Sequence, residues 1–319
     1  MSENIYNVPI IFITFNKYNE TIRVFNEIRK IKPAVLYIVS DGARPDKISD
    51  ESVSKIRDYI ENNVDWDCDL NLRWHGTNQG CKKSVSEGIT WLFENEEYGI
   101  IIEDDCLPSQ HFFRYMEEML IKYQYNEQVM AVCGYRPMKR LPKPHNESYY
   151  FSKYVSFWGW GTWKQAWNKF DFEMADYTKQ VDSGQFRKMF ETFIEYKANK
   201  DAFDATVAGD NSSWGYRWAY TMLNNKGLAI YPYDNQIENI GFCSENATHT
   251  SEQLPDVLSD KIEEMTFPLI HPSEMVRNRV AEKMYSQKLW RKRVLLKMLS
   301  DFLKKVGLYN TLKKMKKRF

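Results

Sequence analysis

The first part of the chain alternates between short apolar runs and amphipathic segments. The apolar runs are rich in Ile and Val and lack regular polar positions, which predicts buried β-strands. The segments between them carry apolar residues with helical periodicity. The expected strands are 9–15, 35–40, 70–74, 99–102 and 129–133, and the expected helices are 20–31, 50–60, 80–93 and one that follows the N-cap Ser109. This order predicts an α/β fold with a mostly parallel, Rossmann-like sheet flanked by helices, and ligands bound beyond the carboxyl ends of the strands.

The pattern changes from about Tyr149 onward. Aromatic residues crowd between Tyr149 and Phe170, and the regular alternation of strands and helices stops. We expect a helix over 214–223, a strand over 227–231 and a polar loop over 246–258. The chain therefore divides into three expected parts, 1–135, 136–270 and 271–319.

The last part contains a basic amphipathic helix. Apolar positions from Leu295 to Val306 share one helical face, and Lys and Arg lie largely opposite. Residues 288–319 hold 12 Lys and Arg against one acid, whereas the whole chain has a net charge of +1, so the first 287 residues carry about −10. Such a helix suits an anionic membrane surface, and the alternative is docking on the acidic body or on a partner chain. Nucleic-acid binding is not expected, because nothing else in the sequence supports base or phosphate readout.

Composition narrows the class of protein further. The 319 residues are 43% hydrophobic, which is enough for a large core. No run approaches the ~20 apolar residues of a spanning helix, and the N-terminal apolar segment is too short for a secretory signal. The five cysteines form no CxxC pair, which favours free thiols over disulfides or structural zinc. We expect a cytoplasmic location, with peripheral attachment to the inner face of the plasma membrane through residues 288–319.

Three adjacent carboxylates, Glu103, Asp104 and Asp105, directly follow the apolar run Gly99–Ile102. They repel one another and lose hydration unless a cation or hydrogen-bond donors compensate them. At the carboxyl end of a parallel strand they face the ligand crevice, where Mg²⁺ or Mn²⁺ takes carboxylate oxygens and phosphates complete the shell. The motif therefore predicts a metal site for a diphosphate, and an acidic loop with helix-capping duties is the alternative.

Polar residues follow two further strands and precede one helix at the same expected edge. Asp41 suits a base N–H or a ribose hydroxyl, and backbone N–H groups with Lys82 at a helix start suit an anion. Neither turn contains a dinucleotide-binding or P-loop glycine pattern. Ordinary turn and capping chemistry explains each feature on its own. The candidates are Thr14, Phe15, Asn16, Asp41, Asn78 and Lys82.

Taken together, the segments PIIFITFNK, SDG, NQGCKKSV and IIIEDDCLPSQHFF resemble the GT-A type nucleotide-sugar glycosyltransferases. Among these, the chain is similar to bacterial sugar transferases related to glycosyltransferase family 2, some of them called hemolysin-like. The EDD motif with its following Ser and paired Phe is also similar to N-acetylglucosaminyltransferase I. The resemblance continues through FWGWGTW and NIGFCSENATHT and covers about residues 8–250. It implies a GT-A fold, with 1–135 binding the nucleotide sugar, 136–270 binding the acceptor, and 271–319 as a helical basic tail.

The resemblance also implies roles for single residues. Asp105 would hold a Mn²⁺ or Mg²⁺ ion on the diphosphate, Asp104 would contact the ribose or a metal-bound water, and Glu103 would contact the donor sugar. His249 would be a further metal or phosphate ligand. The remaining donor-binding residues that it implies, at the uridine, ribose and phosphates, are Thr14, Phe15, Asn16, Asp41, Asn78 and Lys82.

Transfer with inversion needs a carboxylate that takes the proton of the acceptor hydroxyl. Relatives commonly carry an acid beside the Trp that begins the acceptor-side helix, but here Ser213 precedes Trp214. We therefore expect Asp210 to be the base, with Asp204 as the second choice. Sugar rings pack on flat aromatic faces, and core packing is the alternative role for any single Trp. The expected acceptor residues are Trp158, Trp160, Trp163 and Trp214.

The expected function is a metal-dependent, inverting glycosyltransferase of the hexosyltransferase type. It would move a sugar from a UDP-sugar to a hydroxyl of a bacterial cell-surface glycan or lipid-linked acceptor. One alternative is a nucleotidyltransferase that makes the nucleotide sugar, although it would need a glycine-rich phosphate loop after the first strand. The other is a degenerate glycan-binding or membrane-active protein without turnover.

Overall fold

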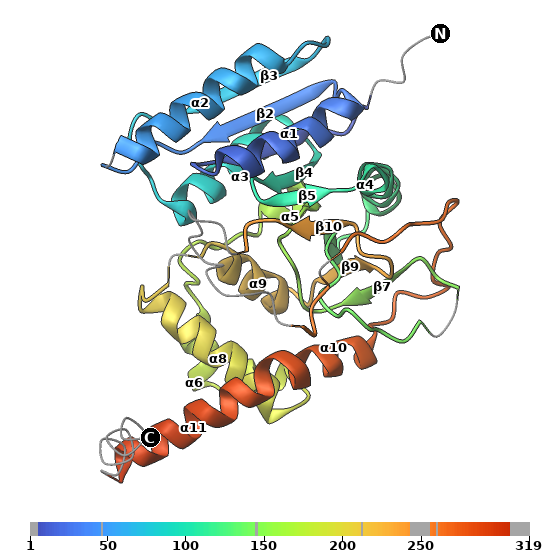
Figure 1. Cartoon of the computed structure of the whole chain (residues 1–319). Helices are drawn as coiled ribbons and strands as arrows, with labels where there is room; N and C mark the ends of the chain where they lie inside the picture. Colours follow the sequence, from blue (N-terminus) through green and yellow to red (C-terminus); the bar gives the residue numbers. More distant parts are fainter. Residues whose placement is uncertain are drawn as a thin grey trace.

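The computed structural model describes residues 6–45, 47–143, 146–211, 213–242, 256–259 and 261–306 (Figure 1). The strands are β1 (Ile10–Thr14), β2 (Val35–Ser40), β3 (Asp69–Trp74), β4 (Tyr98–Glu103), β5 (Cys106–Pro108), β6 (Val129–Cys133), β7 (Tyr149–Ser152), β8 (Trp160–Trp163), β9 (Leu228–Pro232) and β10 (Ile237–Asn239). Eight of them form one sheet in the order β3-β2-β1-β4-β8-β6-β9-β7, and β5 pairs with β10. The fold is α/β and Rossmann-like, as the alternation of apolar runs and amphipathic segments predicts.

The helices connect and cover these strands. They are α1 (Tyr18–Ile31), α2 (Lys47–Asn63), α3 (Cys81–Asn95), α4 (Gln110–Tyr123), α5 (Lys164–Trp167), α6 (Tyr177–Asp182), α7 (Gln185–Lys188), α8 (Phe193–Val207), α9 (Gly215–Asn224), α10 (Arg279–Tyr285) and α11 (Arg291–Lys305), with the π-helical segment η1 (Ser286–Trp290) between the last two. The predictions for β2 and β6 match end to end, and the Ser109 hydroxyl caps α4 by accepting from the Phe112 amide. Local apolar periodicity thus located the elements of the first half of the chain except the short strand β5.

The sheet is parallel on one side and mixed on the other. β3, β2, β1 and β4 run parallel, whereas β8 lies antiparallel between β4 and β6, and β7 is antiparallel to β9. β7 and β8 were not predicted, because they lie in the aromatic-rich stretch and contain no Ile or Val that would mark them as the other buried strands are marked. Strands from the expected parts 1–135 and 136–270 belong to this one sheet.

Successive strand residues point to opposite faces, and each face has its own helical cover. Ile10 and Phe12 pack with apolar residues of α1, α2 and α4, whereas Ile11 and Ile13 pack with those of α3, α5 and α9. A smaller third core joins α6, α7 and α8 to the outer side of α9. The molecule is therefore a helix–sheet–helix sandwich that carries an additional helical layer near its C-terminal half (Figure 1).

The tail begins as a nearly continuous helix, α10–η1–α11, that runs beside α8 at the lower end of the molecule (Figure 1). Val294 is buried, and the Lys297 ammonium lies 3.2 Å from an Asp201 carboxylate oxygen of α8. Docking on the body, the alternative to membrane contact in the sequence analysis, is therefore seen for the start of α11. None of the helices in the described ranges is both long and apolar enough to cross a bilayer. Residues 307–319 lie outside the described part.

Candidate active site

A cleft of about 1060 Å³ opens at the carboxyl ends of β1, β2 and β4. The strand register brings these ends together, because Ile13 of β1 lies beside Glu103 of β4 and Thr14 lies beside Ser40 of β2. As expected from the parallel arrangement, the predicted residues Thr14, Phe15, Asp41, Asn78, Glu103, Asp104 and Asp105 all line this cleft. A cleft of this size exceeds the ~300–1,000 Å³ typical of a single small-molecule site.

The two aspartates of the EDD motif converge on one ammonium group. Lys17 Nζ lies 2.6 Å from Asp105 Oδ2 and 3.8 Å from Asp104 Oδ1. The Phe15 amide donates to Asp104 Oδ2 at 3.0 Å. Lys17 was not singled out in the sequence, although its place just after the first strand puts it at the same edge as the acids. It supplies the compensating charge that adjacent carboxylates require.

Burial controls the acid–base behaviour of this group. Burial first, and then the charges of Asp105 and Asp104, raise the pKa of Glu103 to about 8. Burial also raises the pKa of Asp104, against the opposing charge of Lys17. For Lys17, burial lowers the pKa, but the two aspartates outweigh that effect and raise it well above its ordinary value. One ammonium therefore does not fully compensate three carboxyl groups, and the site favours further positive charge.

The carboxylates fit a divalent ion that is shared with phosphates. Within the described ranges, no three His, Cys, Asp or Glu side chains converge as metal ligands. Asp104 and Asp105 already converge on one cation, and Mg²⁺ is commonly held by one or two carboxylates together with substrate phosphates. The donor set thus suits a jointly held ion and not an all-protein cage. The predicted ligand His249 lies outside the described residues.

The segment that follows β10 covers Asp105 closely. The Ile240 amide donates to the Asp105 carbonyl at 2.8 Å. A Cβ atom on Gly241 would lie 2.4 Å from Asp105 Oδ2, so only glycine leaves the carboxylate in place. Asn239 lines the cleft beside it. This contact places the segment Asn239–Gly241 against the EDD motif, although the two lie far apart in the sequence.

Asp41 fastens the loop after β2 to the start of α3. Its carboxylate accepts from the amides of Gly42 and Gln79 at 2.8 Å and of Gly80 at 3.0 Å. The Asn78 side chain donates to the Gly42 carbonyl at 2.7 Å. Both predicted residues therefore shape this wall of the cleft through their own hydrogen bonds.

Three further residues, Arg44, Asn16 and Lys82, differ in whether they reach this end of the cleft. Arg44, which was not predicted, lines the wall with its guanidinium 5.1 Å from the centre of the Phe15 ring. Asn16 is buried and lies outside the wall. Lys82 also lies outside it, with its ammonium 5.4 Å from the centre of the Phe172 ring. The structure therefore does not bring Asn16 or Lys82 to the cleft surface.

The predicted tryptophans divide into two groups. Trp158 is partly exposed and lines the cleft, whereas Trp214 borders the cleft but is only 3% exposed and packs on Trp160. Trp160 and Trp163 belong to β8 inside the sheet and are 0% and 2% exposed, so they pack the core and do not reach an acceptor. The Trp163 indole donates to the Leu120 carbonyl at 3.0 Å. The structure corrects the prediction that Trp160 and Trp163 bind the acceptor, because antiparallel pairing of β8 with β4 and β6 buries both side chains.

The two acids expected to serve as the base do not line the cleft. Asp210 is exposed and outside its wall. Asp204 accepts from the Tyr177 hydroxyl at 2.8 Å and lies 2.7 Å from the Lys200 ammonium. Asn211 and Ser213, next to Asp210 in the sequence, do line the cleft. The assignment of the base to Asp210 or Asp204 stays a prediction.

The far end of the cleft is built by segments that sequence analysis had assigned to other roles. The C-terminal helix, expected to be an appendage, contributes part of the wall. No local signal distinguishes these positions, since they are ordinary aromatic and basic residues of an amphipathic helix. The lining residues of this end include Tyr154, Tyr285, Leu289, Trp290 and Arg293.

No protein-family model matches the chain, and no curated protein matches it in sequence. Similar solved structures include an apo UDP-glucose pyrophosphorylase, 11% identical with a TM-score of 0.38 over 73% of this chain and 93% of that one. A UDP-glucose pyrophosphorylase complexed with UDP-glucose is 12% identical, with a TM-score of 0.30 over 51% and 78%. HddC from Yersinia pseudotuberculosis is 8% identical, with a TM-score of 0.30 over 50% and 78%. At these identities and scores the likeness assigns no activity to this chain.

Proposed function

We propose that this protein is a glycosyltransferase that moves a sugar from a nucleotide-sugar donor, with UDP as the nucleotide, to the hydroxyl of a glycan. One observation carries the proposal. A single cleft joins a carboxylate group at the ends of parallel strands to a distant wall rich in aromatic side chains. The first end suits a diphosphate with its counter-ion, the second suits a sugar acceptor, and the volume suits both together.

The donor would lie at the EDD end of the cleft. Asp105, with Asp104, would hold a Mn²⁺ or Mg²⁺ ion together with the diphosphate. Such an ion, when bound, offsets the negative charge of the diphosphate and makes it a better leaving group. Lys17 places a second positive charge beside the same carboxylates. The loop that Asp41 fastens to α3 would receive the nucleoside.

Glu103 would contact the donor sugar. It lines the cleft and has no hydrogen-bond or ion-pair partner among the residues the structure describes. Its carboxyl oxygens are therefore available for a hydrogen bond with a hydroxyl of the donor sugar.

In the transfer step, the acceptor oxygen bonds to the anomeric carbon while the bond from that carbon to the phosphate oxygen breaks. The nucleoside diphosphate leaves with the electron pair, and the hydroxyl proton passes to a base, for which Asp210 and then Asp204 are the first residues to test. A nucleotidyltransferase would instead need a glycine-rich phosphate loop after β1. The segment Phe15–Asn19 contains no glycine.

The decisive experiment measures thermal stabilisation by UDP-, GDP-, CMP- and dTDP-sugars, each with and without Mn²⁺. We expect stabilisation that requires UDP and the ion, because a ligand that binds only the folded state raises its stability by about 2.7 kcal/mol at a hundredfold excess over Kd. Asp105→Asn should weaken metal-dependent UDP binding at least about tenfold with the fold intact. Asp65→Asn, which alters a surface ion pair with Arg29, is the matched control.

Product analysis separates the alternatives. Release of UDP with a new glycosidic bond supports the proposal. Formation of pyrophosphate from a nucleoside triphosphate and a sugar 1-phosphate identifies a nucleotidyltransferase, and binding without turnover identifies a glycan-binding protein. If Mn²⁺-dependent binding is unchanged in Asp105→Asn, Asp105 does not hold the metal. If no nucleotide sugar stabilises the protein, the proposal of a transferase is wrong.

A further inference from the structure

Three aromatic rings form one wall at the far end of the cleft. Tyr154 follows β7, Tyr285 ends α10, and Trp290 ends η1. The Trp290 ring centre lies 5.0 Å from each of the two tyrosine ring centres, and the tyrosine rings stack with centres 5.8 Å apart. All three rings are partly exposed and line the cleft.

The π-helical segment explains how two rings of one helix reach the same partner. Tyr285 and Trp290 are five residues apart, and side chains at this spacing point to different faces of an α-helix. In η1 the Arg291 amide donates to the Ser286 carbonyl, a bond across five residues, which brings positions i and i+5 to one side. Such segments often occur at functional sites. Here the irregular turn presents both rings to Tyr154 and the cleft.

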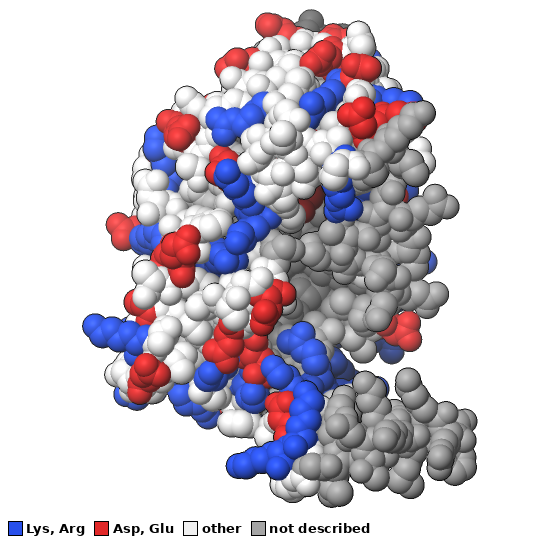
Figure 2. Space-filling view, turned by 90° about the vertical axis from the view of Figure 1, so that its left-hand side faces the viewer, with Lys and Arg blue, Asp and Glu red and all other residues white. Residues whose placement is uncertain are grey.

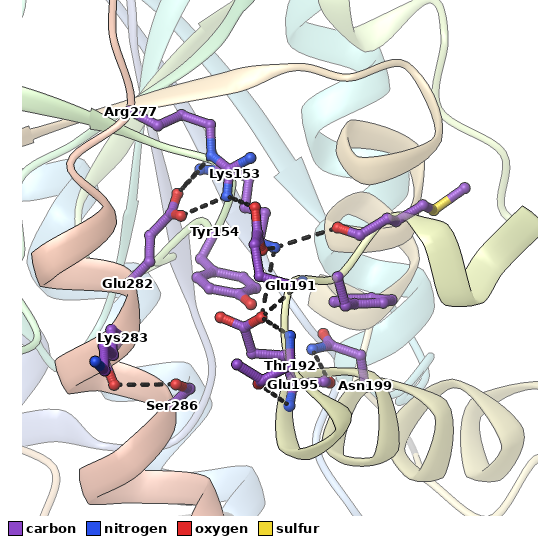
Figure 3. Close-up of polar contacts among 12 residues, drawn as sticks. Lys153, Tyr154, Glu191, Thr192, Glu195, Asn199, Arg277, Glu282, Lys283 and Ser286 are labelled. Carbon is purple, nitrogen blue, oxygen red and sulfur yellow. Dashed lines mark hydrogen bonds and ion pairs between the residues drawn. The ribbon is translucent and has the colours of Figure 1, made fainter.

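The wall rests on a partly buried network of charged groups (Figure 3). Lys153, next to Tyr154, pairs with Glu191, and its amide donates to Glu282 of α10 at 2.8 Å. Arg277 Nε donates to the same Glu282 carboxylate at 3.0 Å. Charged groups held in this way fix the position of Tyr154 relative to α10 before any ligand arrives.

Arg293 adds an uncompensated charge beside the rings. It lies one helical turn after Leu289, lines the cleft and is exposed. Its positive charge opposes the rise in pKa, to about 12, that burial gives Tyr285. The two lysines of the cleft wall, Lys17 and Lys153, pair with acids, whereas Arg293 forms no ion pair within the described ranges.

We propose that Tyr154, Tyr285, Trp290 and Arg293 form an acceptor subsite for a glycan that carries an anionic group, a phosphate, diphosphate or carboxylate. This inference rests on the proposed function and names the substrate class of its second ligand. The rings offer flat faces to the C–H faces of a sugar. The Arg293 guanidinium presents a planar fork of donors that matches a phosphate or carboxylate.

The test measures binding of simple probes to the full chain by saturation-transfer NMR with titration. The probes are glucose 1-phosphate, glucuronic acid, the neutral methyl glucoside, and glucose linked to farnesyl diphosphate. We expect the anionic probes to bind about tenfold or more tightly than methyl glucoside, since a charge-assisted bond is gained. Arg293→Gln should abolish this ratio, and Trp290→Ala should weaken every probe.

Arg291→Gln is the matched control, because Arg291 belongs to the same helix but does not line the cleft. It should leave the charge preference unchanged. Tight binding of the farnesyl probe alone assigns the anion to a lipid diphosphate, and equal binding of the other anionic probes assigns it to the glycan itself. The proposal is overturned if charged and neutral probes bind equally, if no probe binds, or if the ratio of their affinities is unchanged in Arg293→Gln. UDP titration of the same samples reports on the proposed function separately.

Discussion

At the scale of single residues, the EDD motif contains two kinds of carboxyl group. Asp104 and Asp105 are compensated by Lys17, whereas Glu103 has no partner in the described part of the chain. The difference comes from position, because Glu103 ends β4 and the aspartates turn back toward the loop after β1. Glu103 and Asp104 are adjacent in the sequence, yet their different surroundings give the two carboxyl groups different chemistry.

The raised pKa of Glu103 makes stability depend on pH. The unfolded carboxyl has a pKa of 4.5 and the folded one about 8, so the folded protein binds more protons between these values. Its free energy of unfolding should therefore fall as pH rises through this window, by up to about 1.4 kcal/mol per pH unit. Urea unfolding at several pH values measures the slope. Glu103→Gln should reduce it, with the part due to Asp104 remaining, and Glu94→Gln, an exposed residue of α3, should leave it unchanged. An equal slope in Glu103→Gln would exclude Glu103 as its source.

At the scale of elements, α11 changes character along its length. Its start is docked on α8, where Val294 is buried. Farther along, Leu295, Leu299 and Phe302 are 48%, 53% and 60% exposed. Figure 2 shows Lys and Arg side chains at this lower end of the molecule. Exposed apolar side chains next to basic ones are typical of a helix that lies on an anionic lipid surface.

We therefore expect the full chain to bind vesicles that contain phosphatidylglycerol and not vesicles of phosphatidylcholine alone. Flotation measures this binding, which should weaken at high salt because charges are screened. The double substitution Leu299→Asp with Phe302→Asp should reduce it about tenfold or more, since buried apolar area is lost and repulsion is added. Tyr125→Asp, at an 88% exposed aromatic residue of the body, is the control. Undiminished flotation of the double variant would show that α11 does not face the lipid.

At the scale of the whole molecule, the two ends of the cleft have separate supports. The donor end depends on the parallel strands and on Asp41. The far end depends on ion pairs and a hydrogen bond that link Lys153, just after β7, to Glu191, just before α8, and to Glu282 of α10 (Figure 3). Because the C-terminal helix completes the far wall, the second ligand should be sensitive to changes that leave the donor site intact.

Glu282→Gln tests this separation. Glu282 is 3% exposed and accepts from the Lys153 amide and from Arg277, so neutralising it leaves buried donors poorly paired. We expect a loss of about 3 kcal/mol in the free energy of unfolding. UDP affinity should stay the same while binding of anionic sugars weakens. Lys30→Met, which breaks an exposed pair with Glu27, should cost less than about 0.5 kcal/mol. If UDP affinity fell as well, the two ends of the cleft would not be supported by separate sets of contacts.

The amino-acid sequence alone determined the first half of the fold and the edge where the acids lie. Unbroken apolar runs such as 35–40 predict buried strands because local periodicity reports burial directly. Parallel strands place their carboxyl ends together, so Asp41 and Glu103 could be predicted to share one cleft. That inference needs only the order of the elements.

Only the tertiary structure decided which side chains reach the cleft. Trp158 and Trp160 are two residues apart, yet Trp158 lines the cleft and Trp160 is enclosed by the antiparallel pairing of β8. Lys17 and Arg293 are positioned by contacts between distant segments of the chain. Lys17, for example, contacts Asp105, which lies 88 residues away in the sequence. Local periodicity carries no information on such contacts, because strand order and helix docking are set by packing between distant segments.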